Sequence, residues 1–186
     1  MVVVVKEKDR VLLGVTIADI SRYISKNDLI NEENLPYFKV RGEDCFVCYA
    51  GGGLEIEMDV LKYNDKIFRN ITDGNSILQN VIPKLKEIIE PYKGINADGV
   101  MKDCVYIIKG NRAFLITRNF IVHEIENFNC VGNDDVVSGI METIPSLSGE
   151  EKLLTVAREV YDLCGIRSFP FIIFDAKTKK RKVFYN

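Results

Sequence analysis

The hydrophobic positions at the start of the chain form two short, uninterrupted runs. Residues 2–5 are four valines, and residues 11–17 read VLLGVTI, with the charged segment KEKD shortly before them. Apolar, β-branched runs separated by a few polar residues are typical of a β-hairpin whose strands are buried on both faces. Residues 37–40 (YFKV) and 45–50 (CFVCYA), on either side of RGED, predict a second hairpin.

Two helical patterns follow the glycines at positions 51–53. Leu54, Met58 and Leu61 lie at helical spacing and predict a first helix. From about residue 75, spacings of four and three place further apolar residues on one face, namely Ile77, Val81, Leu85 and Ile88. Pro83 lies inside this second pattern. Because proline lacks an N–H group and its ring clashes with the preceding turn, we predict that it interrupts and kinks the helix.

The second half of the chain repeats this alternation of strands and helices. Residues 100–132 contain short apolar runs separated by turn residues and predict about four strands. Apolar residues at 136–141 predict a third helix, and Ser148 with Glu151 has the spacing of a capping box that opens a fourth. The segments FPFIIF and KVFY predict two closing strands. The basic segment 177–182 between them is interpreted as a solvated turn.

The predicted order is four strands, two helices, about four strands, two helices and two strands. Strands this apolar need cover on both faces. The order therefore predicts an α+β fold in which two sheets pack face to face with helices outside, a four-layer αββα sandwich. Neither a linker nor a tandem repeat is evident, so we expect a single domain over residues 1–186.

The composition indicates which classes of partner the protein is expected to bind and in which cellular compartment it is expected to lie. The 186 residues include 27 acidic and 25 basic side chains, well mixed along the chain, which does not predict a nucleic-acid-binding surface. The valine run is too short for a signal-peptide core, and no apolar run approaches the ~20 residues of a membrane helix, so no membrane association is expected. The five cysteines form no regular framework, which predicts free thiols and a cytoplasmic location.

Metal and cofactor sites are not expected. Cys45 and Cys48 have C-x-x-C spacing, but three residues apart in a strand point to opposite faces. His123 is the single histidine and is interpreted as a buried or edge-strand residue. Asp134 and Asp135 are expected to begin a helix, where acidic side chains meet free N–H groups. The acidic segment NEEN at residues 31–34 is interpreted as a solvated loop.

Four segments, in order, resemble the proteasome-type N-terminal-nucleophile hydrolases. They are VVVVKEKDRVLLGVT, FKVRGEDCFVCYAGG, VYIIKGNRAFLIT and NCVGNDD, the last followed by a predicted helix. The likeness is to the β-type subunits and the bacterial ATP-dependent peptidase subunit, since the helical extension of α-type subunits does not precede the first strand. The resemblance implies an αββα fold, a threonine-type endopeptidase and assembly into rings through the helices after the glycine turn.

The family's catalytic groups are not matched in this sequence. The resemblance implies an N-terminal threonine whose α-amino group acts as the base, and Met1 and Val2 occupy that place. The family's acidic residue aligns with Thr16, or with Asp19 if the strand register shifts. Its lysine aligns with Pro36, with Lys39 three residues later at a non-catalytic family position.

Two further features of the family site can be compared. The serine of its G-S-G loop aligns with Asn133. The glycine turn that stabilises the oxyanion is retained as Ala50–Gly53, although crowding between a strand and a helix also explains glycine there.

The sequence therefore favours a non-catalytic, proteasome-subunit-like protein that acts through assembly or partner binding. We assign no catalytic, cofactor-binding or metal residue, and we expect a homo-oligomer or a homologous subunit as partner. An alternative is an N-terminal-nucleophile-type hydrolase with relocated groups, using Asp19, Lys39 or a cysteine. A different αββα or mixed α/β protein with a small-molecule site also stays open.

Overall fold

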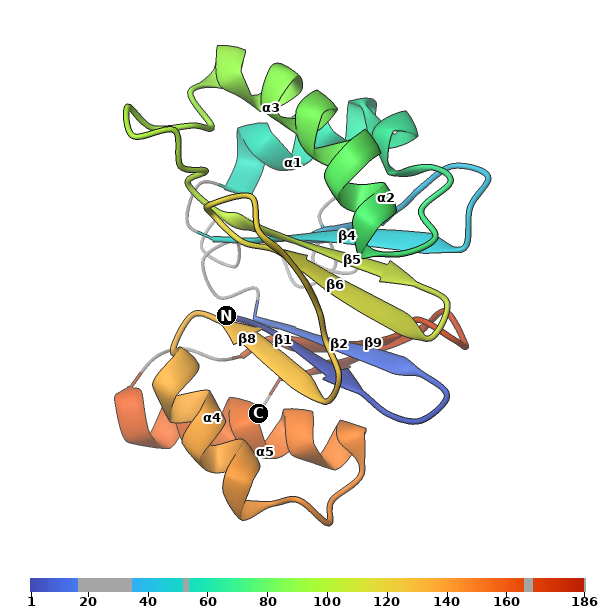
Figure 1. Ribbon diagram of the computed structural model, residues 1–186. Coiled ribbons are helices and arrows are strands. Elements are labelled where there is room, and N and C mark those ends of the chain that lie inside the picture. The colour runs from blue at the N-terminus through green and yellow to red at the C-terminus, as the bar shows by residue number, and fades with distance from the viewer. Residues whose placement is uncertain (17–34, 52–53, 166–168, 186) are drawn as a thin grey trace. The chain divides into compact units, whose positions relative to one another are not determined.

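The computed structural model describes residues 1–16, 35–51, 54–165 and 169–185 (Figure 1). Asp19 and the segment NEEN lie outside the described residues. The chain divides into two compact units, and each is described by itself. The first unit contains residues 1–35 and 126–186, and the second contains residues 36–125. The prediction of a single domain over residues 1–186 stays a prediction.

The first unit is built on a five-stranded antiparallel sheet in the order β10-β9-β2-β1-β8. Its strands are β1 (Val2–Lys6), β2 (Val11–Thr16), β8 (Phe128–Val131), β9 (Phe171–Asp175) and β10 (Lys180–Phe184). The predicted first hairpin and the closing hairpin are confirmed. The valine strand β1 lies between β2 and β8, and each of its four valines is at most 5% exposed.

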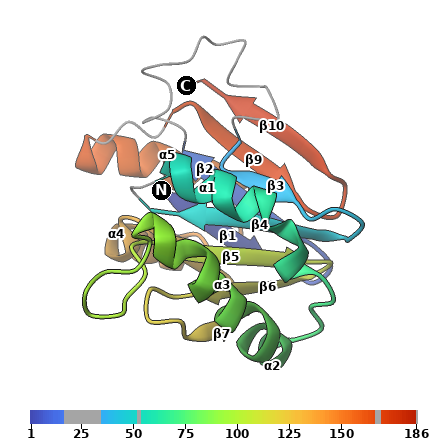
Figure 2. The same ribbon diagram turned by 90° about the horizontal axis from the view of Figure 1, so that it is seen from above.

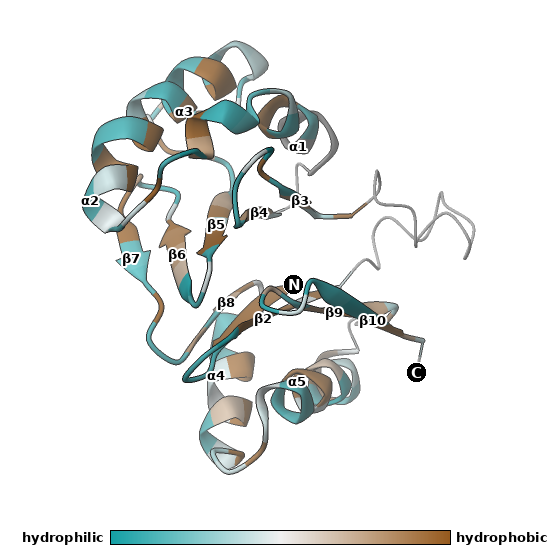
Figure 3. Cartoon of the chain, turned by 90° about the vertical axis from the view of Figure 1, so that its right-hand side faces the viewer, coloured by the Kyte–Doolittle hydropathy of each residue, from teal (hydrophilic) through white to brown (hydrophobic). Residues whose placement is uncertain are grey.

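Two helices, α4 (Asp134–Thr143) and α5 (Gly149–Cys164), cover one face of this sheet. On α5, Leu153, Val156 and Val160 recur at helical spacing and are fully buried in one cluster with Val3 and Val5 of β1. The predicted capping box is confirmed, because Ser148 and Glu151 exchange side-chain-to-backbone hydrogen bonds. In Figure 3, hydrophobic brown residues alternate with teal ones along both helices.

The second unit has a five-stranded antiparallel sheet in the order β3-β4-β5-β6-β7. Its strands are β3 (Tyr37–Lys39), β4 (Cys45–Ala50), β5 (Cys104–Lys109), β6 (Arg112–Ile116) and β7 (Val122–Glu124). Cys45 joins the cluster beneath this unit's helices, and alternation along β4 turns Cys48 to the other face, as predicted. His123 lies on the edge strand β7.

Helical segments cover one face of this sheet, as Figure 2 shows from above. They are α1 (Leu54–Tyr63), η4 (Asp65–Phe68), α2 (Gly74–Ser76), η5 (Ile77–Val81), α3 (Ile82–Ile89) and η6 (Glu90–Tyr92). Two sheets, each with its own helices, confirm the predicted α+β class. The candidate chemistry lies at the strand ends of the two units, so it is described unit by unit below.

The predicted interruption at Pro83 takes the form of a π-helical turn. Pro83 has no N–H group to donate to the carbonyl four residues earlier, and η5 is a π-helix in which the Ile82 N–H bonds the Ile77 carbonyl, five residues back. Leu85 lies after this turn and is fully buried, as predicted. The prediction that Ile88 completes the buried stripe is partly right: Ile88 is partly buried, whereas Ile89 is buried at 4% exposure.

Candidate functional site

The start of β1 is the position at which the family resemblance places the nucleophile. Val2 pairs with Val15 of β2 on one side and with Val131 of β8 on the other. The Thr16 N–H donates a hydrogen bond to the Met1 carbonyl at 3.0 Å, which continues the β1–β2 ladder to the first residue. The main chain here is therefore held on both sides, as a strand end that positions a reactive group requires.

The register decides which side chains can meet at this strand end. Cross-strand partners point to the same face, and neighbours along a strand point to opposite faces. Val2 therefore shares a face with Val15, while Met1 and Thr16 lie on the other face, the one covered by α4 and α5. The packing of Met1 against the buried cluster of those helices agrees with this assignment. Thus, of the two residues at the nucleophile place, Met1 shares a face with Thr16, whereas Val2 lies on the opposite face.

The Thr16 hydroxyl is buried without a hydrogen-bond partner among the described residues. Leaving a buried hydroxyl unpaired costs about 1–3 kcal/mol. The site around it is consequently better suited to an apolar side chain than to the carboxylate that the family uses.

This burial gives a testable expectation for Thr16. The isosteric change Thr16→Val removes the unpaired hydroxyl and is expected to leave stability unchanged or raise it by up to about 1 kcal/mol. Thr16→Asp is expected to lower stability by about 2–4 kcal/mol, because it buries a charge without a partner. Urea denaturation of both variants measures the difference, and a more stable Thr16→Asp protein would contradict the described burial.

The turn after β8 crosses close to the first residue of the chain. Gly132 has φ +90°, and a side chain there would begin 3.5 Å from the Met1 Cα atom. Asn133 occupies the family's serine position and has left-handed backbone angles at the start of α4, with no capping hydrogen bond from its side chain. Asp134 and Asp135 form the first turn of α4, as predicted.

The buried cysteines are candidates for a relocated nucleophile, and burial strongly raises the pKa of the Cys48 thiol on β4. Cys130 on β8 lies 3.1 Å from the Gly132 carbonyl oxygen, and burial raises the pKa of its thiol to about 12. Burial likewise raises the pKa of the Cys45 thiol on β4 to about 12. Because the thiolate is the reactive form, these three residues are protonated and unreactive near neutral pH.

In the second unit, the residues at the family's lysine position do not form a charged site. Pro36 is buried and carries no charge, and its carbonyl accepts a hydrogen bond from the Tyr49 N–H at 3.3 Å. Lys39 is exposed on the edge strand β3. Among the residues that the structure describes, no group of three or more histidine, cysteine or acidic side chains could hold a metal ion.

The glycine turn after β4 has a structural cause that the sequence did not reveal. Asp103 precedes β5 at the position opposite Gly51 and is only 2% exposed. Its Oδ1 atom lies 1.2 Å from where a Cβ atom of residue 51 would be, so only glycine fits. The Tyr49 hydroxyl donates a hydrogen bond to the other carboxyl oxygen at 2.9 Å. The packing of Asp103 therefore explains the glycine at position 51, independently of any role of the turn in stabilising an oxyanion.

No protein-family profile matches the chain, and no curated protein sequence matches it significantly. Among solved structures, Thiobacillus denitrificans BPH in complex with epoxomicin has a TM-score of 0.69 at 16% identity, covering 94% of this chain and 96% of that one. The chain has the fold of the proteasome β-type subunits.

Two further structures agree with this assignment. Eukaryotic HslV from Trypanosoma brucei has a TM-score of 0.59 at 11% identity, covering 94% of this chain and 97% of that one. Anbu, the ancestral beta-subunit, from Yersinia bercovieri has a TM-score of 0.63 at 11% identity, covering 99% of this chain and 86% of that one. The likeness extends over nearly the whole length of each chain, and the fold predicted from the resemblance is confirmed.

Proposed function

We propose that this protein is a non-catalytic member of the proteasome-subunit fold that acts by assembly or partner binding. The observation that carries the proposal is the set of side chains at the start of β1. Met1 and Val2 stand at the nucleophile place, and Thr16 stands at the acid position, so none of these side chains has the chemistry required. A nucleophile and its supporting groups act as a unit, so their joint loss removes the catalytic arrangement as a whole.

The alternative, a hydrolase with relocated groups, receives no support from Cys45 or Cys130. Burial raises the pKa of Cys45 and Cys130 to about 12, so neither supplies a thiolate near neutral pH. Lys39 is exposed on an edge strand, and Asp19 lies outside the described residues. A functional role through contacts with other subunits uses the fold without requiring any of these groups.

Location and partner are part of the same proposal. All five cysteines are free, which suits a reducing compartment such as the cytoplasm. No helix in the described part of the chain could cross a membrane. The partner that we propose is a second copy of this chain or a homologous subunit.

A peptide-hydrolysis assay tests the non-catalytic assignment. The purified protein, and a Val2→Thr variant processed so that the threonine is N-terminal, are expected to show no turnover of fluorogenic peptides that epoxomicin abolishes. The added hydroxyl still lacks an acid at position 16 and a lysine at position 36. General acid–base assistance of this kind is worth about 10²–10⁴-fold.

Epoxomicin serves as the probe because it is bound by the structural neighbour BPH. An active threonine peptidase, assayed in parallel, is the positive control for substrate and inhibitor. Robust turnover by the unmodified protein that epoxomicin abolishes would refute the proposal. Turnover by the Val2→Thr variant alone would show that the supporting groups are present and only the nucleophile is missing.

A further inference from the structure

The C-terminal end of α5 carries charges that its own helix does not favour. Asp162 lies in the last turn of the helix and Glu159 one turn earlier, and no basic residue lies in the last turn. A helix C-terminus has a partial negative charge, so an acidic side chain there is destabilising by about 0.3–1 kcal/mol. This cost within one molecule is offset if a basic group from elsewhere covers the helix end.

The same helix end exposes two large hydrophobic residues. Leu163 is 67% exposed and Tyr161 is 47% exposed, although neither belongs to the buried stripe of α5. These apolar side chains lie beside acidic ones. A partner surface that contains both aliphatic and basic atoms would therefore be complementary to this helix end. Lysine side chains provide both, because their long methylene stems pack on apolar surface while the ammonium group stays solvated.

The first unit contains such a basic segment at the turn between β9 and β10. Five of the six residues from 177 to 182 are basic: Lys177, Lys179, Lys180, Arg181 and Lys182. Much of this charge is balanced locally: Lys177 pairs with Asp9, Lys182 pairs with Glu150, and Lys179 and Arg181 also have interaction partners within the protein. Lys180 is exposed on the edge strand β10, which is largely hydrophilic in Figure 3.

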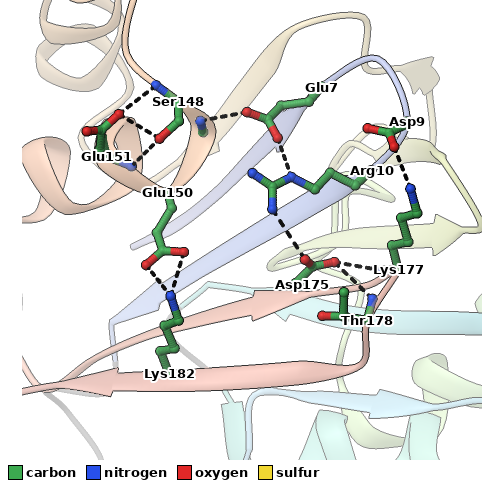
Figure 4. A network of polar contacts seen from close by, with 11 residues as sticks. Glu7, Asp9, Arg10, Ser148, Glu150, Glu151, Asp175, Lys177, Thr178 and Lys182 are labelled. Carbon is green, nitrogen blue, oxygen red and sulfur yellow. Dashed lines mark hydrogen bonds and ion pairs between the residues drawn. The ribbon is translucent and has the colours of Figure 1, made fainter.

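These two complementary surfaces cannot meet within one molecule. Lys182 contacts Glu150 at the N-terminal end of α5 (Figure 4). Asp162 lies twelve residues further along the helix, roughly 18 Å away at 1.5 Å per residue. Figure 1 shows the β9–β10 turn and the C-terminal end of α5 at opposite ends of this unit.

We propose that the basic turn at residues 177–182 of one copy docks on the C-terminal end of α5 in a second copy. The second copy is the occupant because both halves of the complementary pair are present on every chain and are held apart within it. Two different surfaces meet in such a contact, so it is head-to-tail, and repeating it gives a closed ring or an open helical array. This inference rests on the proposed function in assembly, and it specifies which two surfaces of the copies meet.

Charge reversal tests this contact. The first variant is Lys179→Glu with Lys180→Glu, and the second is Glu159→Lys with Asp162→Lys. The second variant places basic residues at a helix C-terminus and is expected to fold at least as well as the unmodified protein. Sedimentation equilibrium at low and high salt measures self-association, and each variant alone is expected to weaken it about tenfold or more.

The decisive measurement is the combination of the two variants. Mixing them, or placing all four changes in one chain, is expected to restore self-association because the charges are again complementary. Glu142→Lys, at an exposed position outside the proposed contact, is the matched control and is expected to leave association unchanged.

The outcomes separate this surface from assembly in general. If the unmodified protein is monomeric at all concentrations and binds no homologous subunit, both the proposed assembly and this contact are wrong. If it self-associates and the charge-reversal variants associate equally well, assembly stands and this contact is wrong. If each variant weakens association and their combination does not restore it, the two surfaces do not contact each other.

Discussion

Replacing Gly51 with alanine is expected to lower the free energy of unfolding by about 3–5 kcal/mol. The new Cβ atom would lie 1.2 Å from the Asp103 Oδ1 atom, so the buried carboxyl group must move. Moving it breaks the buried hydrogen bond from the Tyr49 hydroxyl. Urea denaturation followed by circular dichroism measures the change.

A second glycine provides the matched control. Gly139 lies in α4 with nothing within 4 Å of the position of a Cβ atom, so Gly139→Ala is expected to stabilise the protein by about 0.5–1 kcal/mol. In the Gly51→Ala background, Asp103→Ala is expected to recover part of the loss, because it removes the clashing atoms. If Gly51→Ala proves neutral, or the two changes are simply additive, the described packing of Asp103 is wrong.

Replacing Glu7 with alanine is expected to lower the free energy of unfolding by about 2 kcal/mol. The Glu7 carboxylate accepts a hydrogen bond from the Gly149 N–H at 2.7 Å and another from the Arg10 side chain, which also reaches Asp175 (Figure 4). It thereby joins the β1–β2 turn to the first residue of α5. Glu126, whose side chain is 77% exposed, is the control, and Glu126→Ala is expected to change stability by less than about 0.5 kcal/mol.

The same carboxylate gives the protein a pH dependence of known sign. The hydrogen bond from Arg10 is the main reason that the pKa of Glu7 lies below its usual value of 4.5. A lowered pKa in the folded state gives stability that is present above pH 4.5 and is lost as the pH falls through the folded-state pKa. Between pH 6 and pH 3, the urea midpoint is expected to fall less in Glu7→Gln than in the unmodified protein. Equal falls would exclude Glu7 as a contributor.

Elements with strong local signals were predictable from the sequence. The β-branched runs at residues 2–5 and 11–17 predicted the first hairpin, because β-branched residues favour strands over helices. Ser148 and Glu151 marked the start of α5, because a capping box depends only on residues three positions apart. The change from strand to helical periodicity after Gly51 located the helices of the second unit.

Features that depend on register or on contacts distant in sequence were not predictable. The sequence aligned Thr16 with the family's acid, but only the observed pairing of Val2 with Val15 shows that Thr16 faces the helices. Asp103 gave no signal of its own beyond being an acid directly before an apolar strand. Its burial against Gly51 follows from the β4–β5 register. Similarly, Pro83 predicted an interruption but not that it takes the form of a π-helical turn.

The division of the chain has a consequence for how the protein folds as it is synthesised. The second unit is one continuous segment, residues 36–125, so every contact within it is available once that segment has left the ribosome. The sheet of the first unit pairs β1 with β8 and β2 with β9, strands from opposite ends of the sequence. Such long-range pairing pays a large loop-closure entropy and forms slowly. The face of the valine strand that α5 covers therefore stays exposed until residues 149–164 have been synthesised, which lengthens the time during which this segment is prone to aggregation.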